Sequence, residues 1–262
     1  MTYDTIKFQI EAGVATLTLN RPERLNAFSD AMHGDIRAAL DHMERDGSAR
    51  CLVVTGAGRG FCAGADLAQP TMTNSGKRDV GETLEKNYNP LIKRLRDLPM
   101  PTVAAVNGPA AGAGMSLAMA CDILIAARSA SFLQAFCNIG LVPDAGSTYF
   151  LPRLVGRQRA AGMALLGEKL PAETAAEWGL IWKCVDDDKL QAEVGALAAK
   201  LAGGPTKGLG LIKQALQASW DHDLDRQLDM ERDLQRIAGG TADFAEGVAA
   251  FLQKRPPKFQ GR

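Results

Sequence analysis

The first regular pattern in the chain is an alternation of apolar and polar positions. Residues 6–10 and residues 14–19 each alternate, and the short segment between them ends in a glycine, Gly13. A period of two residues is typical of strands with one buried face. The sequence therefore predicts an opening β-hairpin over residues 6–19.

Helical and strand patterns then follow one another. Ser29 and Asp30 predict the start of a helix that runs to about Arg45, and the apolar run from Cys51 to Val54 predicts a buried strand. The pattern continues with a helix over about residues 80–98 and a strand over residues 102–106. A Gly/Ala-rich turn and another helix then lead to a further strand over residues 122–126. This order predicts an α/β fold that presents backbone turns at successive strand ends.

The last quarter of the chain has a different character. After about residue 192 there is no β-branched run, and leucine and isoleucine recur at helical spacing to about residue 253. These apolar positions are more numerous than a small tail needs for packing on itself, so we expect them to cover the core or another subunit. We therefore expect residues 1–198 to form the core and residues 199–262 a helical oligomerisation region.

Composition excludes several classes of function. The 262 residues are 46% hydrophobic, and 30 basic residues balance 30 acidic ones, so no overall field attracts nucleic acid or an anionic membrane. No window approaches the roughly 20 apolar residues of a membrane-spanning helix, and the N-terminus lacks a signal-peptide pattern, which predicts the cytoplasm. The five cysteines include no CxxC pair and are expected to be reduced and packed.

The three histidines, His33, His42 and His222, show no metal-ligand spacing. Each lies in a polar, helix-like stretch and is expected to face solvent. We therefore expect no metal site, and most Ser-His-Asp schemes are disfavoured.

Three glycine-rich turns follow apolar strands. They are TGAGRGFCAGAD, NGPAAGAGMSLAMACD and IGLVPDAGSTYFLPRLVG, over residues 55–66, 107–122 and 139–156. Glycines let main-chain N–H groups approach a ligand, and Gly112 precedes a helix whose N-terminus aims unpaired amides at the turn. Each turn alone is also consistent with a purely structural role. The third turn contains Asp144, which could equally cap the following helix, and Asp66 has the same alternative.

The order of these motifs resembles the enoyl-CoA hydratase/isomerase, or crotonase, superfamily. The matching strings are LTLNRPERLNAFSDAM, VVTGAGRGFCAGADL, PTVAAVNGPAAGAGMSLAMACDILIAA and IGLVPDAGSTYFLPRLVG, in that order. The resemblance covers nearly the whole chain and implies a spiral of repeated ββα units with a C-terminal helical region. It also implies an acyl-CoA substrate, no cofactor beyond the coenzyme A of that substrate, and assembly as a homotrimer or a dimer of trimers.

The resemblance assigns roles to particular positions. The N–H groups of Ala65 and Ala113 correspond to the oxyanion hole that binds the thioester oxygen, where each preorganised donor is worth roughly 2.7–4 kcal/mol. Coenzyme A and the acyl group are expected to contact two backbone strips and three further positions. The first strip is Arg24, Leu25 and Ala27, and the second is Ala63, Asp66 and Leu67. The further positions are Gly112, Ser116 and Phe136.

Departures from the family pattern indicate the reaction. Hydratases of the family carry glutamates at the positions of Ser116 and Phe136, so the acid and base pair for adding water is absent from those positions. Asp144 stands where several family isomerases and a dehalogenase carry a catalytic aspartate. A single carboxylate suits a proton transfer between two carbons, and an apolar pocket with Phe136 should raise its pKa.

Within the superfamily the chain most resembles the isomerases of phenylacetate catabolism that convert ring-1,2-epoxyphenylacetyl-CoA to oxepin-CoA. The likeness includes ALLGEKL, EWGLIWKCVDD, GLGLIKQAL and QLDMERDLQRIAG and therefore extends into the C-terminal helices. Such enzymes are also expected to shift a 3-enoyl-CoA double bond to the 2-position. Ser147, where glycine is more usual, leaves the exact acyl group open.

Other functions are alternatives. Within the family, the alternative is an enoyl-CoA hydratase or another fatty acyl-CoA crotonase. The alternative of another class is a non-catalytic protein that binds acyl-CoA. The string VVTGAGRGFCAG superficially resembles a dinucleotide-binding loop. However, Cys62 stands where that loop has its final glycine, and the string does not follow the first strand of the chain, where such a loop belongs. The string GMSLA around Ser116 approximates a hydrolase elbow without a well-placed histidine.

Overall fold

The computed structural model describes residues 2–68 and 79–262. Its main sheet has six strands in the order β1-β2-β3-β4-β6-β9. Their bounds are Ile6–Glu11, Val14–Leu19, Cys51–Gly56, Thr102–Val106, Ile123–Ala127 and Lys183–Val185. β1 and β2 pair antiparallel and the remaining pairs are parallel. The predicted hairpin, the strands and the α/β class are confirmed.

A second, smaller sheet lies beside the carboxyl ends of the main strands. It contains β5 (Ala110–Ala111), β7 (Ser131–Leu133) and β8 (Lys169–Pro171) in the order β5-β7-β8. The chain visits a main strand, then a small-sheet strand, then a helix: β4 and β5 precede α4 (Ala113–Ala120), and β6 and β7 precede α5 (Ser147–Val155). This order is the repeating ββα unit that the family resemblance implies.

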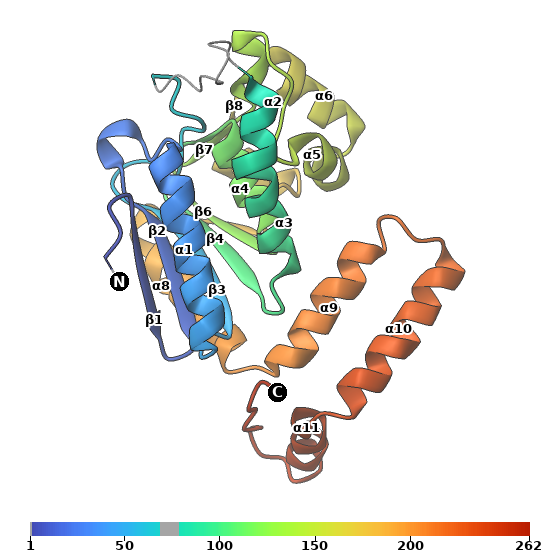
Figure 1. Ribbon diagram of the computed structural model, residues 1–262. Coiled ribbons are helices and arrows are strands. Elements are labelled where there is room, and N and C mark those ends of the chain that lie inside the picture. The colour runs from blue at the N-terminus through green and yellow to red at the C-terminus, as the bar shows by residue number, and fades with distance from the viewer. Residues whose placement is uncertain (1, 69–78) are drawn as a thin grey trace.

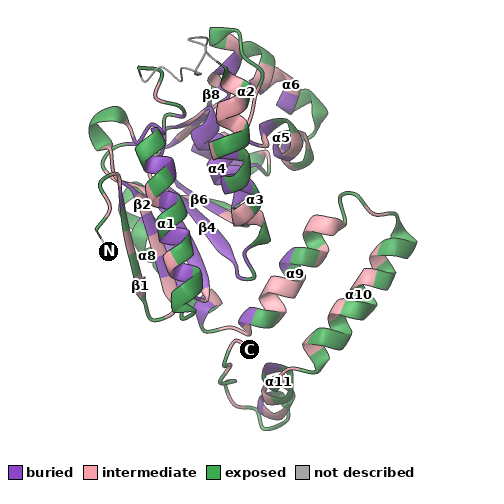
Figure 2. Ribbon diagram, in the orientation of Figure 1, coloured by how far each residue is buried: buried purple, intermediate pink, exposed green. Residues whose placement is uncertain are grey.

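Helices cover both faces of the main sheet. α1 (Asp30–Asp46) and α8 (Leu190–Ala202) lie on opposite faces of the strands in Figure 1. The Ser29 hydroxyl caps α1 by accepting a hydrogen bond from the Met32 N–H at 3.2 Å, as predicted. β4 between these layers is buried throughout, which Figure 2 shows in purple. Such burial on both faces explains why the central strands read as continuous apolar runs.

The predicted helix over residues 80–98 consists of three joined pieces. α2 (Val80–Thr83) passes through one π-helical turn (Leu84–Tyr88) into α3 (Asn89–Asp97). Two further α-helices, α6 (Arg157–Leu166) and α7 (Ala172–Glu177), follow α5. Three short 3₁₀ segments are Pro22–Arg24, Ala135–Ile139 and Asp187–Lys189. Among the described residues, no helix combines the length and apolar character needed to cross a membrane.

The last three helices form an arm that projects from the sheet in Figure 1: α9 (Thr206–Ala218), α10 (Leu224–Gly239) and α11 (Ala242–Leu252). Large apolar side chains of this arm are exposed. They are Ile212, Leu216, Leu224, Leu228, Ile237, Phe244, Phe251 and Leu252. Apolar surface on this scale is typical of a face that another protein surface covers.

An ion pair between a buried lysine and a partly exposed aspartate fixes the root of the arm to the core. Lys213 of α9 places its Nζ 3.0 Å from Oδ2 of Asp122 and donates to the Leu95 carbonyl at 2.9 Å. Asp122 also accepts hydrogen bonds from the N–H and the hydroxyl of Thr102, each at 2.8 Å. Since Thr102 begins β4 and Asp122 precedes β6, the arm is attached at the amino ends of the central strands.

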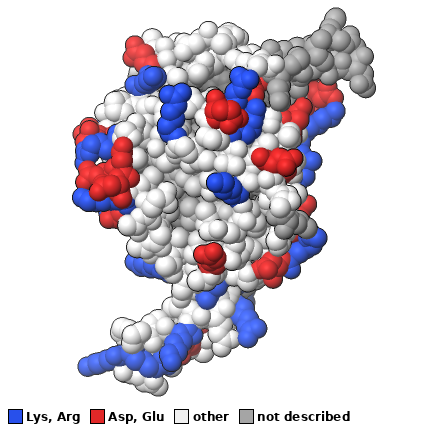
Figure 3. Space-filling view, turned by 90° about the vertical axis from the view of Figure 1, so that its left-hand side faces the viewer, with Lys and Arg blue, Asp and Glu red and all other residues white. Residues whose placement is uncertain are grey.

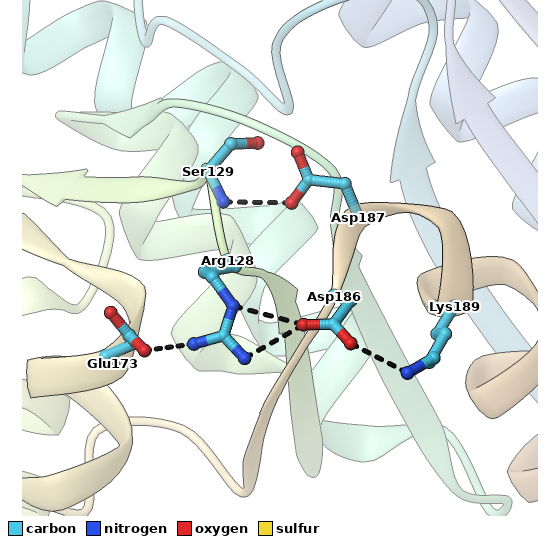
Figure 4. A network of polar contacts seen from close by, with 6 residues as sticks. All are labelled: Arg128, Ser129, Glu173, Asp186, Asp187 and Lys189. Atoms are coloured by element: carbon cyan, nitrogen blue, oxygen red, sulfur yellow. Dashed lines mark hydrogen bonds and ion pairs between the residues drawn. The ribbon is translucent and has the colours of Figure 1, made fainter.

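Surface charges elsewhere are mixed in sign, and several of them form ion pairs. Arg128 after β6 reaches Asp186 after β9 at 2.9 Å and also Glu173, and Lys189 reaches Asp186 at 2.7 Å (Figure 4). On the face in Figure 3, Lys and Arg are interspersed with Asp and Glu over the body of the molecule. Exposed pairs of this kind contribute little to stability, so the ion pair of the buried Lys213 is the better target for a test.

We predict that Lys213→Met lowers the free energy of unfolding by about 2 kcal/mol, because the ammonium group of the buried Lys213 no longer bonds the Leu95 carbonyl and the partly exposed Asp122 carboxylate. Urea titration followed by circular dichroism, at fixed protein concentration, measures the change. The matched control is Arg232→Met in α10, whose ion pair with Asp229 has side chains 56% and 70% exposed; we expect no measurable change there. Equal urea midpoints for Lys213→Met and wild type would contradict the anchoring role.

Candidate active site

A cavity of about 580 Å³ lies where the turns after β3 and β4 meet α1, the π-helical turn and the loop before α5. Its lining includes three carboxylates, Asp30, Asp66 and Asp144, together with His33 and Tyr88. Most of the remaining lining is apolar side chain or backbone. The cavity therefore combines a few titratable groups with a mostly apolar lining, which is the usual composition of a small-molecule site.

Two glycine-rich turns come into direct contact at this cavity. Cys62 and Ala110 form a parallel β-bridge, and the Ala111 N–H donates to the Cys62 carbonyl at 2.9 Å. Gly64 has a φ of +92°, and a Cβ on it would lie 2.9 Å from the Ala111 carbonyl oxygen and 3.4 Å from the Ala113 nitrogen. Only glycine fits this approach. The contact places the backbone at residue 65 beside the N-terminus of α4.

The N–H groups of Ala65 and Ala113 are available for a ligand. The bridge between Phe28 and Ala65 uses the N–H groups of Phe28 and Asp66, each bonded at 2.8–2.9 Å, and leaves the Ala65 N–H outside it. Ala113 is the first residue of α4, where an N–H has no partner within the helix. Within the described part of the chain neither N–H group has a hydrogen-bond acceptor, and both residues line the cavity.

Asp144 lines the same cavity from the loop before α5. Burial raises the pKa of its carboxyl to about 6, which agrees with the expected direction of the shift. Its Oδ1 is buried and has no hydrogen-bond partner among the described residues. The N-cap of α5 is Gly146, without a side-chain cap, so Asp144 does not perform the capping role considered as its alternative.

The two predicted strips lie side by side. The Ala63 N–H donates to the Leu25 carbonyl at 2.9 Å, and Arg21 bonds both the Ala27 carbonyl, at 2.6 Å, and Asp66, at 2.9 Å. The bond from Arg21 lowers the pKa of the Asp66 carboxyl. Ala63, Asp66 and Leu67 line the cavity, whereas Arg24, Leu25 and Ala27 are not among the described residues that line it.

Of the three further predicted positions, Gly112 and Phe136 line the cavity and Ser116 does not. Ser116 is fully buried behind the wall, and its hydroxyl bonds the carbonyl of Asp144 at 3.0 Å and the hydroxyl of Ser147 at 2.9 Å. The expected contact of Ser116 with substrate is therefore corrected. No histidine bonds Ser116, which also removes the support for a hydrolase.

The expectation that all three histidines face solvent is wrong for His33. Its side chain is 5% exposed, stacks on Phe28 with centroids 4.9 Å apart, and meets the edge of Tyr88 at 4.4 Å. Burial lowers its pKa to about 4, so the ring is neutral at pH 7. The signal was present in the sequence, because His33, Ile36 and Leu40 follow the apolar period of α1.

Asn26 is a second residue that sequence reasoning missed. It is fully buried, and its Nδ2 donates to the carbonyls of Ala57 at 2.9 Å and Gly60 at 2.8 Å. These bonds hold the first glycine-rich turn against the strip around Leu25. A polar residue between Leu25 and Ala27, before an apolar pair, was the available signal.

Comparisons with known proteins agree over the full chain. Residues 9–262 match the sequence profile of the enoyl-CoA hydratase/isomerase family. The chain is 56% identical to the 1,2-epoxyphenylacetyl-CoA isomerase of Escherichia coli over 254 residues, 97% of each chain. It is 49% identical to the "Probable enoyl-CoA hydratase" of Rhodobacter capsulatus over 262 residues, 100% of each. A solved enoyl-CoA hydratase from Bacillus anthracis superposes with a TM-score of 0.90 at 31% identity, covering 99% of this chain and 100% of that one.

Asp144 should make the fold less stable as the pH rises. An acid whose pKa is higher in the folded chain stabilises the fold below the unfolded pKa, here 3.8, and loses that contribution as the pH rises through the folded value of about 6. Asp144→Asn removes the charge. We expect the variant to melt at the wild-type temperature near pH 4 and about 2–4 °C higher at pH 8, for a solvent-screened effect of roughly 1 kcal/mol.

Thermal denaturation at both pH values, followed by circular dichroism, provides the measurement. Asp188→Asn, which removes an exposed carboxylate, is the matched control and should leave both melting temperatures unchanged. A melting temperature for Asp144→Asn below wild type at pH 8 would show that the carboxylate has a stabilising partner.

Proposed function

The chain belongs to the enoyl-CoA hydratase/isomerase family and is an enzyme of that family, and we propose that it isomerises acyl-CoA thioesters. The proposed reactions are conversion of ring-1,2-epoxyphenylacetyl-CoA to oxepin-CoA and transfer of a 3-enoyl-CoA double bond to the 2-position. The observation that carries the proposal is a single unpaired carboxyl, Asp144, in one cavity with two free backbone N–H groups, those of Ala65 and Ala113.

The proposed mechanism is a proton transfer through a thioester enolate. The Asp144 carboxylate removes a proton from carbon 2, and the charge that forms on the thioester oxygen is stabilised by hydrogen bonds from Ala65 and Ala113. The protonated Asp144 then returns the proton to carbon 4 of a 3-enoyl chain. With the epoxide substrate the proton returns to a ring carbon, and the ring carbon–carbon bond that the epoxide spans breaks as the double bonds shift, so that the epoxide oxygen becomes part of the seven-membered oxepin ring. No atom is gained or lost, so the reaction is an isomerisation and needs no cofactor beyond the coenzyme A of the substrate.

The pKa of Asp144 suits both halves of this transfer. At about 6 it lies close to neutral pH, so the carboxylate is available as the base and its conjugate acid is strong enough to return the proton. No charged neighbour contributes to the shift, since burial is its cause. The carboxyl is thus kept in an apolar setting, without a partner that would fix it in one protonation state.

Coenzyme A is proposed to lie along the two backbone strips. Leu67 and Asp66 line the cavity, and the exposed Arg24, on the 3₁₀ segment Pro22–Arg24, is close enough to Asp66 to help lower the pKa of its carboxyl. The Arg24 guanidinium is proposed to bind a phosphate of coenzyme A. The Arg21 side chain is not assigned this role, because it forms an ion pair with Asp66.

Hydration is the alternative within the family, and the cavity does not favour it. Adding water needs a base and an acid on opposite sides of the double bond. The other two lining carboxylates are unsuited to this task, because Asp66 is paired with Arg21 and Asp30 is exposed at the rim, where its Oδ1 accepts from the Asn87 amide. Ser116 and Phe136 supply no carboxylate.

We propose that the chain acts in the cytoplasm as a homotrimer or a dimer of trimers. The exposed apolar side chains of α9, α10 and α11 support assembly, because a monomer would leave them in water. The mixed surface charge and the absence of net charge give no support to a nucleic-acid or membrane partner.

We predict that Asp144→Asn lowers kcat for 3-enoyl-CoA isomerisation by about 10²–10⁴, the contribution of a positioned acid and base. Formation of the conjugated thioester followed by absorbance measures kcat, and deuterium uptake from solvent measures the first proton transfer. For wild type, kcat/KM should fall about tenfold per pH unit below 6, because the base must be ionised. Asp188→Asn should behave as wild type.

A variant with wild-type kcat would remove Asp144 from the mechanism. Binding of acyl-CoA by wild type without deuterium exchange would instead favour a non-catalytic binding protein. Hydration of 2-enoyl-CoA faster than isomerisation of 3-enoyl-CoA would favour the hydratase alternative.

The proposed assembly predicts that Phe251→Glu shifts the protein toward smaller species, because Phe251 of α11 is 83% exposed in the single chain. Sedimentation velocity should show a trimer or a dimer of trimers for wild type and mostly monomer for the variant. Glu11→Lys on β1 changes an exposed charge outside the arm and should leave the sedimentation coefficient unchanged. Monomeric wild-type protein would contradict the assembly.

A further inference from the structure

A chain of buried side-chain hydrogen bonds ends on the backbone of Asp144. The Gln134 amide nitrogen lies 3.0 Å from the Ser147 hydroxyl, which lies 2.9 Å from the Ser116 hydroxyl, which lies 3.0 Å from the Asp144 carbonyl oxygen. Gln134, Ser116 and Ser147 are all 0% exposed. Three buried polar side chains in series are costly unless each is hydrogen-bonded, so their arrangement calls for an explanation.

The two ends fix the direction of the chain. The Asp144 carbonyl can only accept, and the Gln134 Nε2 can only donate. When Ser116 donates to the Asp144 carbonyl, Ser147 accepts from Gln134 and donates to Ser116, while the Gln134 Oε1 has no hydrogen-bond partner among the described residues. The Ser116 proton in turn points to the Asp144 carbonyl, with the Gly112 carbonyl, 3.2 Å away, as its second neighbour.

The loop that receives this bond is held in an unusual conformation. Ala145 has a φ of +49° and Gly146 a φ of +85°, so the backbone directly after Asp144 is left-handed at two successive residues. A non-glycine residue in this region needs support from its surroundings. Besides the Ser116 hydroxyl, the Asp144 carbonyl accepts the Ser147 N–H at 2.9 Å.

The described residues supply no hydrogen bond to the Asp144 carboxyl. Its Oδ1 has no partner among the described residues, and no neighbouring charge affects its pKa. The position of the carboxyl therefore follows the backbone that carries it. Ser116 belongs to α4, whose first residue is Ala113, so one hydroxyl connects the helix that presents the N–H group to the loop that presents the acid.

We propose that Ser116 is a positioning residue that fixes Asp144 relative to the N-terminus of α4, and that Ser147 and Gln134 orient its hydroxyl. This inference rests on the proposed role of Asp144. Because a displacement of about 1 Å can reduce a rate about 10²-fold, a hydroxyl that never touches substrate can control the chemical step.

The test compares Ser116→Ala with Ser147→Ala, each at a position that is 0% exposed. We expect kcat for 3-enoyl-CoA isomerisation to fall about 10- to 100-fold in Ser116→Ala with KM changed less than about threefold. Ser147→Ala leaves the bond from Ser116 to Asp144 possible and should reduce kcat about 3- to 10-fold. Ser116→Cys, a weaker donor of similar size, should lie between Ser116→Ala and wild type.

The pH profile separates positioning from a general loss of structure. A loosened Asp144 gains contact with water, so the acid limb of kcat/KM should move to lower pH in Ser116→Ala by about half a unit or more. The other titratable side chains that line the cavity, Asp30, His33, Asp66 and Tyr88, make no hydrogen bond to Ser116. Thr206→Val removes a buried hydroxyl at the start of α9 and should leave kcat and the pH profile as in wild type.

Two results would overturn the inference. One is a folded Ser116→Ala enzyme with kcat within twofold of wild type while Asp144→Asn is inactive. The other is equal loss of kcat in both serine variants with an unshifted acid limb, which would indicate a structural role only. If Asp144→Asn is fully active, the proposed function has failed, whatever Ser116→Ala does.

Discussion

The close contact between the turns after β3 and β4 is the constraint on which the site depends. Parallel neighbouring strands bring these turns to the same edge of the sheet, but only a residue without a Cβ lets one backbone approach the other as Gly64 approaches Ala111 and Ala113. That contact determines where the two free N–H groups lie. Both groups belong to the main chain, so side chains around the cavity can vary without removing them.

The remaining component of the site is a carboxyl that the fold holds at some cost. Burial without a partner disfavours the charged form of Asp144, which destabilises the folded chain at neutral pH and brings the pKa close to the working range. A partner such as the one Arg21 provides for Asp66 would improve stability and keep the carboxyl ionised. The contrast between the two aspartates shows why only one of them suits a reversible proton transfer.

Much of this architecture could be predicted from the sequence because it depends on local patterns. The hairpin follows from alternation, the start of α1 from Ser29, and the glycine-rich turns from their composition; the place of Asp144 in the site followed from the family resemblance. The environment of single side chains could not be predicted in the same way, because it depends on contacts between distant segments. From the sequence, His33 is expected on the polar surface of a helix, but in the fold the π-helical turn places Tyr88 against it. Ser116 is expected to line the pocket, but in the fold its hydroxyl bonds the carbonyl of Asp144.

The arm and the cavity lie at opposite ends of the same strands, and this separation limits how they can influence each other. Lys213 is anchored where β4 and β6 begin, whereas the residues that line the cavity follow the ends of β3 and β4. A strand of five residues spans roughly 17 Å, and the strands between are almost entirely buried. Coupling between the arm and the cavity along these strands would require two alternative packed arrangements of the strands.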